Sequence, residues 1–374
     1  MKSLNIAVLK GDGIGIEVTN QALKVLDSIS KRFSLDVKTH EYLVGGAAID
    51  DCGSALPEST LNGCLDSDAI LFGAIGGPKW DKKTSNQEAS HSYDTPEKGL
   101  LALRKGLEVY ANVRPVSVFP ALLDASSLKP SVIEGVDLVV VRELVSGIYF
   151  GKPRGLEIRN GERVGFNTMI YTESEISRIA RYALKLASRR RRKLCLVDKA
   201  NVLEVSQLWR EVVSEVALRY KEVDLSFQYV DNASMQLIRS PRDFDVILTN
   251  NLFGDILSDE ASQLTGSIGL LPSASIGDKS ALYEPIHGSA PDIAGKNLAN
   301  PMASILSLGL MFEISFGMKH VNVLIREAIE GLLARGIRTH DLASFGASEV
   351  LGCNEIGDLV AASVLSAPLS DSHE

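Results

Sequence analysis

Cysteine is scarce in this chain, and the arrangement of the few cysteines excludes both a thiolate metal centre and a disulfide framework. No two of them have CxxC spacing, and no histidine pattern accompanies them. Free thiols in a reducing compartment are therefore expected. The 374 residues contain four cysteines, Cys52, Cys64, Cys195 and Cys353.

Long hydrophobic runs and an excess of positive charge are also missing. No apolar stretch approaches the roughly 18 residues of a membrane span, and no charged-then-apolar leader precedes the first apolar run, which begins by Leu4. The formal net charge of −8 leaves no basic footprint for nucleic acid, and cations at a helix end explain the run from Arg189 to Lys193. We expect a cytoplasmic protein with neither a membrane nor a nucleic-acid partner.

The residues that are present indicate an α/β protein. With 45% hydrophobic and 23% charged residues, the composition is globular, and the length suffices for two domains. A helix is predicted from about residue 96 to 110, ended by Pro115, and the polar stretch 81–93 is interpreted as a lid-like loop. Asn160-Gly161 between β-prone flanks predicts a hairpin. Because an isolated hairpin is marginal in water, pairing with the same arm of a second subunit is attractive.

Four apolar runs end in charged or amide residues. The runs cover residues 136–141, 194–197, 227–230 and 246–249. They are followed by Arg142, by Lys199 after Asp198, by Asp231, and by Asn250. Ligands of α/β sheets bind at this edge, and arginine or lysine cannot cap a helix N-terminus as an acid can. The pattern therefore predicts a site in which arginine side chains bind the carboxylates of a ligand, aspartates bind a cation, and a lysine lies near both.

Asp255 and Asp259 follow the last of these runs at a spacing of four residues. On a helix they lie on one face, about one turn apart. Hard oxygen ligands at the end of a buried strand suit Mg²⁺ or Mn²⁺. Taken alone, the pair is better explained by a helix-dipole contact at Asp255 and a solvated surface acid at Asp259, and the strand-end pattern favours the metal site.

Three glycine-rich segments stand out, and the first and the last of them are candidate ligand loops. Gly11, Gly13 and Gly15 follow a strand but have G-x-G-x-G spacing, which indicates a tight turn more than a dinucleotide motif. Gly76-Gly77-Pro78 ends the strand at 70–72. The segment 281–300 contains many Gly, Pro and Asn residues and is predicted to lack regular structure.

Several segments, in this order and spacing, resemble one family: GDGIG, GGPKW, LLALRK, NVRP, VRELVSGIYFG, VDKANVL, YVDN, NLFGDILSDE and HGSAPDIAGKNLANP. Over nearly its whole length the chain resembles the β-decarboxylating dehydrogenases that act on isocitrate and isopropylmalate. The resemblance implies a two-domain fold without the usual Rossmann motif. The first domain would combine residues 1–109 and 266–374, and the second, residues 110–265, would contain a dimer arm and the interface of a homodimer.

The resemblance also implies a reaction: a 2-hydroxy-3-carboxy acid is oxidised with NAD and loses its 3-carboxylate as CO₂, with Mg²⁺ or Mn²⁺ bound. The isopropylmalate members, which make 4-methyl-2-oxopentanoate (2-oxoisocaproate) in leucine biosynthesis, are the most similar. Isocitrate, homoisocitrate or tartrate as substrate, and a non-catalytic binding protein of this fold, are the alternatives. The departures Ile16, Ser234 and Cys353-Asn354 touch no implied catalytic residue.

Site roles carried over from the resemblance fall into four groups. Lys199 would be the base and Tyr149 the acid. The metal ligands would be Asp255, Asp259 and, across the dimer, Asp231. The substrate contacts would be Arg104, Arg114, Arg142, Asp231, Glu97, Leu100, Leu101 and Val202. Of these, Leu100, Leu101 and Val202 would line the pocket of the 3-substituent. The cofactor contacts would be Gly76, Gly77, Glu284, His287, Gly288, Ser289, Ala290, Asp292 and Asn300.

Overall fold

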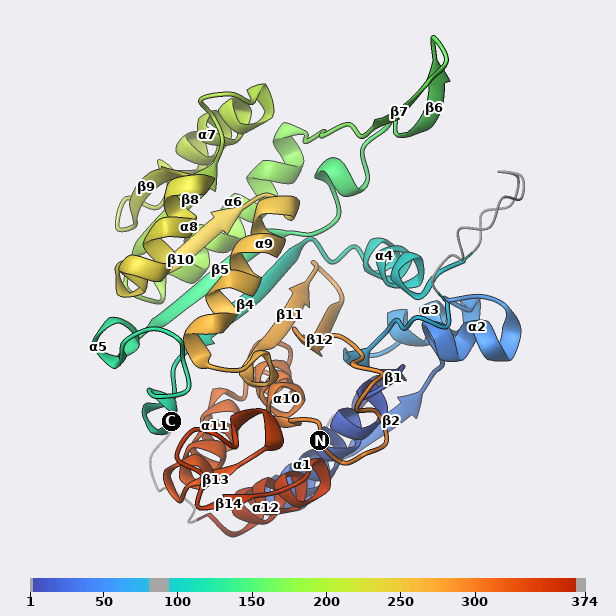
Figure 1. Ribbon diagram of the computed structural model, residues 1–374, viewed down its shortest axis with the longest axis vertical. Helices are drawn as coiled ribbons and strands as arrows, with labels where there is room; N and C mark the ends of the chain where they lie inside the picture. Colours follow the sequence, from blue (N-terminus) through green and yellow to red (C-terminus); the bar gives the residue numbers. More distant parts are fainter. Residues whose placement is uncertain (1–2, 81–93, 368–374) are drawn as a thin grey trace. The chain divides into compact units, whose positions relative to one another are not determined.

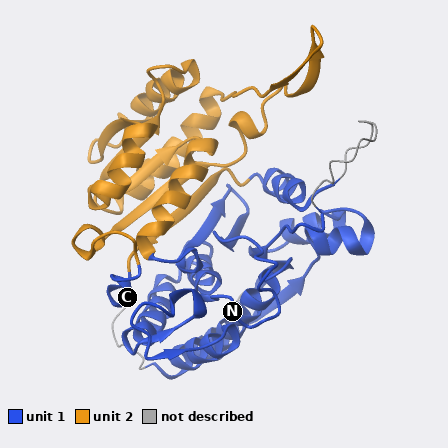
Figure 2. Ribbon diagram, in the orientation of Figure 1, with its two compact units in different colours: residues 1–108, 119–125, 266–374 blue, residues 109–118, 126–265 orange. Residues whose placement is uncertain are grey.

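The computed structural model describes residues 3–80 and 94–367. The chain forms two compact units, coloured separately in Figure 2: unit 1 comprises residues 1–108, 119–125 and 266–374, and unit 2 comprises residues 109–118 and 126–265. Relative to the predicted domains, the main difference is that residues 119–125 group with unit 1. Both units combine strands with helices, so the α/β prediction is confirmed. The loop predicted at 81–93 lies outside the described residues.

Unit 1 contributes five strands in the order β2-β1-β3-β12-β11. They are β1 (Leu4–Gly11), β2 (Val37–Glu41), β3 (Ala69–Ala74), β11 (Pro272–Ile276) and β12 (Ala281–Pro285). The pairs β1–β2, β1–β3 and β3–β12 are parallel, and β11 is antiparallel to β12. The prediction that residues 281–300 lack regular structure is wrong at its start. All five residues of β12 are buried, and β3 and β11 pair with it on either side.

The helices of unit 1 surround these strands. They are α1 (Gly15–Phe33), α2 (Gly46–Cys52), α3 (Glu58–Leu65), α4 (Pro96–Gly106), α10 (Met302–Ile314), α11 (Lys319–Ala334) and α12 (Cys353–Ser366). Buried side chains occupy most of α10, which packs on α1 and α11 and forms the centre of the core. The helix predicted to run to about residue 110 ends at Gly106, and Pro115, which was expected to end it, lies within strand β4 of unit 2.

Unit 2 has its own five strands, in the order β4-β5-β10-β8-β9 (Figure 1). They are β4 (Ala111–Ser117), β5 (Asp137–Glu143), β8 (Lys193–Asp198), β9 (Asp224–Tyr229) and β10 (Val246–Thr249). Strands β5, β10, β8 and β9 are parallel, and β4 is antiparallel to β5. The carboxyl ends of the parallel strands therefore share one edge, as the four apolar runs predicted.

Helices cover both faces of the unit 2 strands. They are α5 (Pro130–Ile133), α6 (Glu173–Ser188), α7 (Glu204–Ala217), α8 (Val230–Arg239) and α9 (Asn251–Ser262). α6 packs with α7, and α8 packs with α9, which crosses in front of β4, β5 and β10 in Figure 1. β9 is an edge strand, so Phe227 and Tyr229 are 38% and 39% exposed, unlike the side chains of a buried run.

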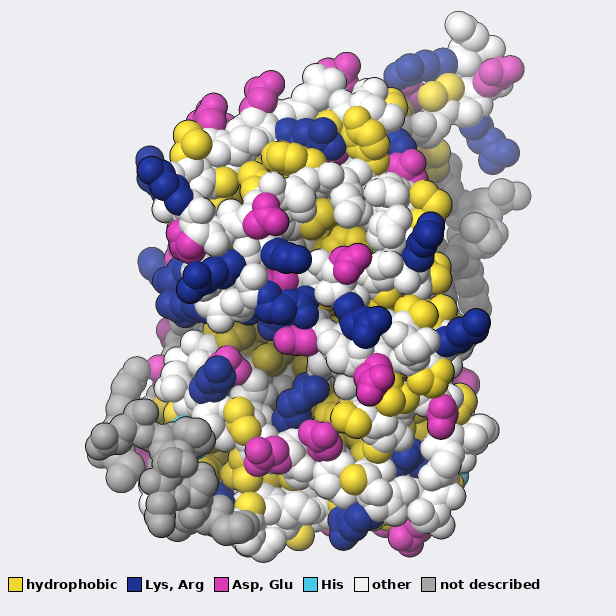
Figure 3. Space-filling view, turned by 90° about the vertical axis from the view of Figure 1, so that its left-hand side faces the viewer, with side chains coloured by type: hydrophobic (Ala, Val, Ile, Leu, Met, Phe, Trp, Pro, Cys, Tyr) yellow, Lys and Arg dark blue, Asp and Glu magenta, His cyan; other side chains and the backbone are white. Residues whose placement is uncertain are grey.

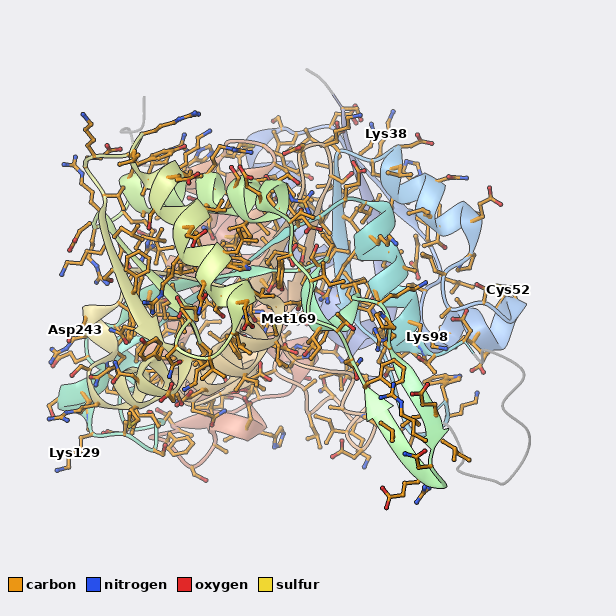
Figure 4. The ribbon with its side chains drawn as sticks, turned by 90° about the horizontal axis from the view of Figure 1, so that it is seen from above. Lys38, Cys52, Lys98, Lys129, Met169 and Asp243 are labelled. Carbon is orange, nitrogen blue, oxygen red and sulfur yellow. The ribbon has the colours of Figure 1, made fainter. Side chains whose placement is uncertain are left out.

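The predicted hairpin is confirmed as β6 (Gly155–Arg159) and β7 (Glu162–Phe166). Its turn residues Asn160 and Gly161 have φ angles of 52° and 83°, as a type I′ turn requires. Figures 1 and 4 show the hairpin extending beyond the rest of unit 2. Two of its apolar side chains face solvent in this chain, Leu156 at 87% and Ile158 at 74% exposure.

The state of the cysteines and the distribution of surface charge are as expected from the sequence. All four cysteines are free; Cys52 is exposed, and the others are buried. On the face shown in Figure 3, basic and acidic side chains are interspersed instead of forming a field of one sign. Within residues 3–80 and 94–367, no helix combines the length and hydropathy needed to cross a membrane.

Candidate active site

Three predicted residues meet at the carboxyl edge of the unit 2 strands. Asn250 caps α9 by accepting a hydrogen bond from the Phe253 N–H at 3.0 Å, so Asp255 projects from the second turn. The Tyr149 hydroxyl, in the turn after β5, donates to Asp255 Oδ2 at 2.8 Å. Arg142, at the end of β5, donates from Nη1 to Asp255 Oδ1, and its guanidinium carbon lies 5.7 Å from the centre of the Tyr149 ring.

Arg114 joins the same cluster from the neighbouring strand β4. It is 7% exposed. Its Nε donates to Asn112 Oδ1 and its Nη1 to Ser258 Oγ, both at 2.6 Å. Its Nη1 also lies 3.5 Å from Asp259 Oδ1, and its Nη2 lies 3.9 Å from Asp255 Oδ1. Two arginines thus face two carboxylates one helical turn apart.

The electrostatics of this cluster keep Tyr149 protonated. Partial burial and then the hydrogen bond to Asp255 raise its pKa, against the opposing charges of Arg142 and Arg114. Burial likewise raises the pKa of Asp259, with a smaller contribution from Asp255, while Arg114 opposes the shift. A protonated phenol beside a half-exposed carboxylate is a suitable proton donor for a bound organic acid.

Lys199 and Asp231 form a second contact at the same edge. Lys199 Nζ lies 2.6 Å from Asp231 Oδ1, and this hydrogen bond lowers the pKa of the Asp231 carboxyl. The preceding residue, Asp198, is fixed by Arg210, whose Nε and Nη2 donate to its two oxygens at 2.6 and 3.0 Å. This pair and the bond from the Lys199 N–H to Ser206 Oγ hold the backbone of the predicted base.

The predicted metal ligands are not all gathered within one chain. Asp255 and Asp259 share a face of α9, whereas Asp231 lies at the start of α8 and bonds to Lys199. Among the described residues, no group of three His, Cys, Asp or Glu side chains is placed to hold a metal ion. The role of Asp231 across a dimer remains a prediction.

Other predicted substrate contacts lie on α4 in unit 1. Arg104 donates from Nη2 to Glu284 Oε1 at 2.8 Å, and both side chains are nearly buried. Leu100 and Leu101 are half-buried, and Glu97 is exposed. Val202 belongs to unit 2 and is 62% exposed, so the pocket predicted to include both leucines and Val202 stays a prediction.

The loop after β12 carries the predicted cofactor contacts. The Ser289 carbonyl accepts from the Ile14 N–H at 2.7 Å, and its hydroxyl donates to the Gly76 carbonyl at 2.7 Å. The glycine-rich turn after β1 and the Gly76 turn after β3 therefore converge on this loop. The Cβ of any larger residue at Gly13 would lie 2.1 Å from the Ser289 oxygen, which explains the glycine.

His287 is the buried polar group of this loop. Its Nδ1 contacts the Gly288 carbonyl oxygen at 2.9 Å. Its Nε2 is buried and has no hydrogen-bond partner within the part of the chain that the structure describes. Burial lowers the pKa of the imidazole, so His287 is neutral near pH 7. A buried ring nitrogen without a partner is suited to a ligand group.

The remaining predicted contacts vary in exposure. Gly288 and Asp292 are exposed and Gly77 is half-buried. Ala290 has a positive φ of 37°. Asn300 bonds to Asp341 and to the Met302 N–H.

Several residues that hold the predicted site residues in place were not predicted from the sequence. The Asp12 carboxylate accepts hydrogen bonds from three backbone N–H groups, those of Gly46, Ala47 and Gly76. An acid between two glycines was the signal, but its partners lie 34 to 64 residues away. Asn112, Ser258 and Asn251 hold the site arginines. Uncharged polar residues at strand and helix ends are common, so none of them stood out.

Comparison with known proteins identifies the family of this chain. The chain belongs to the isocitrate/isopropylmalate dehydrogenase family, whose model matches residues 5–360. It is 56% identical over 361 residues to 3-isopropylmalate dehydrogenase of Wolinella succinogenes, covering 96% of this chain and 98% of that protein. It is 54% identical to the Aquifex aeolicus enzyme of the same name, covering 96% and 97% of the two chains.

A solved structure shares the fold at lower identity. Isocitrate dehydrogenase from Methylococcus capsulatus superimposes with a TM-score of 0.83 at 32% identity, covering 97% of this chain and all of that one. The resemblance stated from the sequence motifs is therefore confirmed.

Proposed function

We propose that this chain oxidises 3-isopropylmalate with NAD⁺ and decarboxylates the product to 4-methyl-2-oxopentanoate, a step of leucine biosynthesis. The observation that carries the proposal is the cluster of Tyr149, Arg142 and Asp255 at the carboxyl edge of the unit 2 strands. Relatives that share more than half of its residues over nearly the full chain carry the name of this activity.

Each charged group has a task in this reaction. Arg114 and Arg142 bind the carboxylates of the malate moiety, for which a planar guanidinium is well shaped. Arg104, on α4 of unit 1, is the third arginine assigned to the substrate carboxylates in this proposal. Lys199 removes the proton of the 2-hydroxyl, and Tyr149 protonates the carbanion left by CO₂. The raised pKa of Tyr149 keeps its proton in place until that step.

A divalent cation fits the donors of α9. Asp255 and Asp259 offer carboxylate oxygens on one face of the helix, with side chains 36% and 62% exposed in this chain. Their all-oxygen chemistry suits Mg²⁺ or Mn²⁺, with Asp231 of a second copy as the third ligand. When bound, the ion supplies stabilisation of negative charge on the substrate's 2-oxygen. Full turnover after exhaustive EDTA treatment would contradict this assignment.

A nicotinamide dinucleotide fits the loop of unit 1. The buried Nε2 of His287, which has no hydrogen-bond partner among residues 3–80 and 94–367, offers a polar contact, and the exposed Gly288 allows close backbone approach. The cofactor contacts in this proposal also include Gly76, Gly77, Glu284, Ser289, Ala290 and Asn300. Asp292 is exposed on the same loop, where its carboxylate accepts from an adenosine ribose hydroxyl and repels a 2′-phosphate, so NAD⁺ is preferred over NADP⁺.

The active form in this proposal is a homodimer. Helices α8 and α9 carry three apolar side chains that are between 50% and 59% exposed: Met235, Ile238 and Ile256. Together with Leu156 and Ile158 of the arm, they form the kind of apolar surface that a second copy covers. Lys199 and Asp231 then serve the site of the partner.

Mixing inactive Lys199→Ala and Asp255→Ala subunits tests this sharing. One site of a mixed dimer carries both lesions and the other carries none, so partial activity should return. No recovery despite demonstrated subunit exchange would refute shared sites.

One assay tests the substrate. NAD⁺ reduction is followed with 3-isopropylmalate, isocitrate and malate in parallel, with Mg²⁺ present. 3-Isopropylmalate should give the highest kcat/KM, since burial of its isopropyl group is worth about 2 kcal/mol relative to malate. If isocitrate is turned over as efficiently as 3-isopropylmalate, the substrate proposal is wrong.

A further inference from the structure

Asn251, the first residue of α9, has no role in the reaction proposed above, yet its side-chain amide makes four hydrogen bonds at the site. It is 1% exposed. Its Oδ1 accepts two hydrogen bonds from the guanidinium of Arg142, from Nε at 3.0 Å and from Nη2 at 2.7 Å. A third guanidinium nitrogen, Nη1, is thereby turned towards Asp255.

The amide itself cannot rotate, because its other atoms are also bound. Nδ2 donates to the carbonyl oxygens of Leu144 and Ser146, both at 3.1 Å. Carbonyl oxygens only accept, so this end must be the NH₂ group and the end facing Arg142 must be the oxygen. The backbone N–H of Asn251 donates to the Tyr171 hydroxyl at 2.9 Å. The end of β5, which carries Arg142, and the start of α9, the helix that carries Asp255, are thus joined through one residue.

An amide oxygen orients a guanidinium without neutralising it. Arg104 in unit 1 shows the alternative, an ion pair with the buried Glu284. A carboxylate at position 251 would satisfy the same two N–H groups but would offset the positive charge and leave the two carbonyls without donors. We infer that Asn251 is a positioning residue, which aims Arg142 at the substrate carboxylate and preserves its charge. This inference rests on the proposed function and deepens it.

Two substitutions separate orientation from charge. Asn251→Ala removes the acceptor, and Asn251→Asp retains it but adds a negative charge. Asn62→Asp, on the exposed surface of α3, makes the same charge change away from the site. The dissociation constant for 3-isopropylmalate is measured by calorimetry with Mg²⁺ and without NAD⁺, and the Michaelis constants and kcat are measured in turnover.

Both Asn251 variants should weaken the binding of 3-isopropylmalate, raising its dissociation constant and its Michaelis constant on the order of 10- to 100-fold, the scale of one charge-assisted hydrogen bond. KM for NAD⁺ should change by less than about twofold, and Asn62→Asp should match the wild type in all respects. A structural lesion would instead lower the thermal midpoint and affect both substrates. If either Asn251 variant binds 3-isopropylmalate as the wild type does, the inference is wrong.

A double-mutant cycle with Arg142→Lys tests whether Asn251 acts through Arg142. Lysine has no planar fork to orient, so Asn251→Ala should add less than about twofold to the loss already caused by Arg142→Lys. Full additivity of the two losses would overturn the inference. Failure of the wild type to bind 3-isopropylmalate would refute the proposed function instead, which keeps the two outcomes distinct.

Discussion

The two units hold their predicted site residues by different means. In unit 2, the site side chains bond to one another: Asp255 accepts from Arg142 and Tyr149, and Lys199 pairs with Asp231. In unit 1, the candidate cofactor loop is held mainly through backbone groups, as in the bonds from Ile14 N–H to the Ser289 carbonyl and from the Ser289 hydroxyl to the Gly76 carbonyl. Apart from the Arg104–Glu284 ion pair, backbone groups hold the candidate loop of unit 1, whereas contacts between side chains hold the site residues of unit 2.

This difference separates the expected effects of substitution. Reactive groups that are fixed by mutual ion pairs change the chemical step when they are removed. A loop fixed by its backbone tolerates loss of one side chain and changes mainly the affinity for what it binds. Removal of the reactive groups of unit 2 should therefore lower kcat, whereas substitutions in the cofactor loop of unit 1 should raise KM for the cofactor.

The largest expected effect is that of Tyr149→Phe, compared with His287→Gln in unit 1. Loss of the phenolic proton donor should lower kcat by about 10²- to 10⁴-fold, with KM for NAD⁺ within about twofold of the wild type. His287→Gln should raise KM for NAD⁺ by about tenfold, because one hydrogen-bonding group is replaced, and leave kcat within about threefold. Steady-state kinetics with both substrates varied decide the matter. A kcat loss in His287→Gln as large as in Tyr149→Phe would abolish the distinction between the units.

The sequence predicted the site residues of unit 2 better than the backbone contacts of unit 1. The apolar runs of unit 2 locate Arg142, Lys199 and Asp231 correctly, since parallel strands must end at a common edge. The spacing of Asp255 and Asp259 places both on one helix face. These features depend on local patterns of one strand or helix, and such patterns can be read from a single sequence.

Backbone-held features could not be predicted, because they join distant segments. β12 contains a proline and a glutamate, which favour an irregular loop in the sequence, yet its two neighbouring strands make it a buried strand. The Asp12 carboxylate accepts from backbone N–H groups, and the Asn251 amide donates to backbone carbonyls. The positions of these backbone groups depend on the complete fold. Pro115 indicates a helix end in the sequence, although the helix ends earlier at Gly106 and Pro115 lies in β4.

The next prediction concerns the stability of unit 2. Glu143 is fully buried next to Arg142 in the chain, and burial raises its pKa to about 7, although the N–H groups of Val145 and Ser146 bond to it. A folded pKa above the unfolded value of 4.5 means that the folded state holds the proton more tightly. Stability should therefore fall as pH rises from about 4.5 to about 7, by about 3 kcal/mol in total.

Glu143→Gln removes this titration. Relative to the wild type, its free energy of unfolding should improve by about 3 kcal/mol between pH 4 and pH 8, as measured by urea denaturation at several pH values. Glu162→Gln, on the exposed arm, should show no such trend. Parallel pH profiles for wild type and Glu143→Gln would mean that Glu143 does not titrate in this range.

A smaller effect is expected at Asp292 in unit 1. Asp292→Ser removes the carboxylate that is proposed to accept from the ribose hydroxyl and to repel a 2′-phosphate. The ratio of kcat/KM for NAD⁺ over NADP⁺ should fall by about 10- to 100-fold, while kcat with saturating NAD⁺ stays near that of the wild type. Asp278→Ser, which removes a charge from the turn between β11 and β12, is the control. Equal use of the two cofactors by the wild type would already refute the role of Asp292.

The smallest expected effect is that of replacing Leu100 and Leu101 on α4, because these side chains are proposed to make only apolar contacts with the substrate. Both are half-buried, whereas the nearby Leu103 is fully buried. Replacing Leu100 and Leu101 with Ser and Asn should lower kcat/KM for 3-isopropylmalate by about tenfold, since part of the roughly 2 kcal/mol from isopropyl burial is lost. The value for malate should stay within about twofold, and discrimination against isocitrate should narrow because an apolar wall no longer faces its carboxylate.

Leu103→Ala distinguishes this pocket from the core of unit 1. It should cost about 2–5 kcal/mol of stability and leave the preference among the three acids unchanged. An equal loss of kcat/KM for 3-isopropylmalate and malate in the double variant would show that Leu100 and Leu101 support the helix and do not select the substrate.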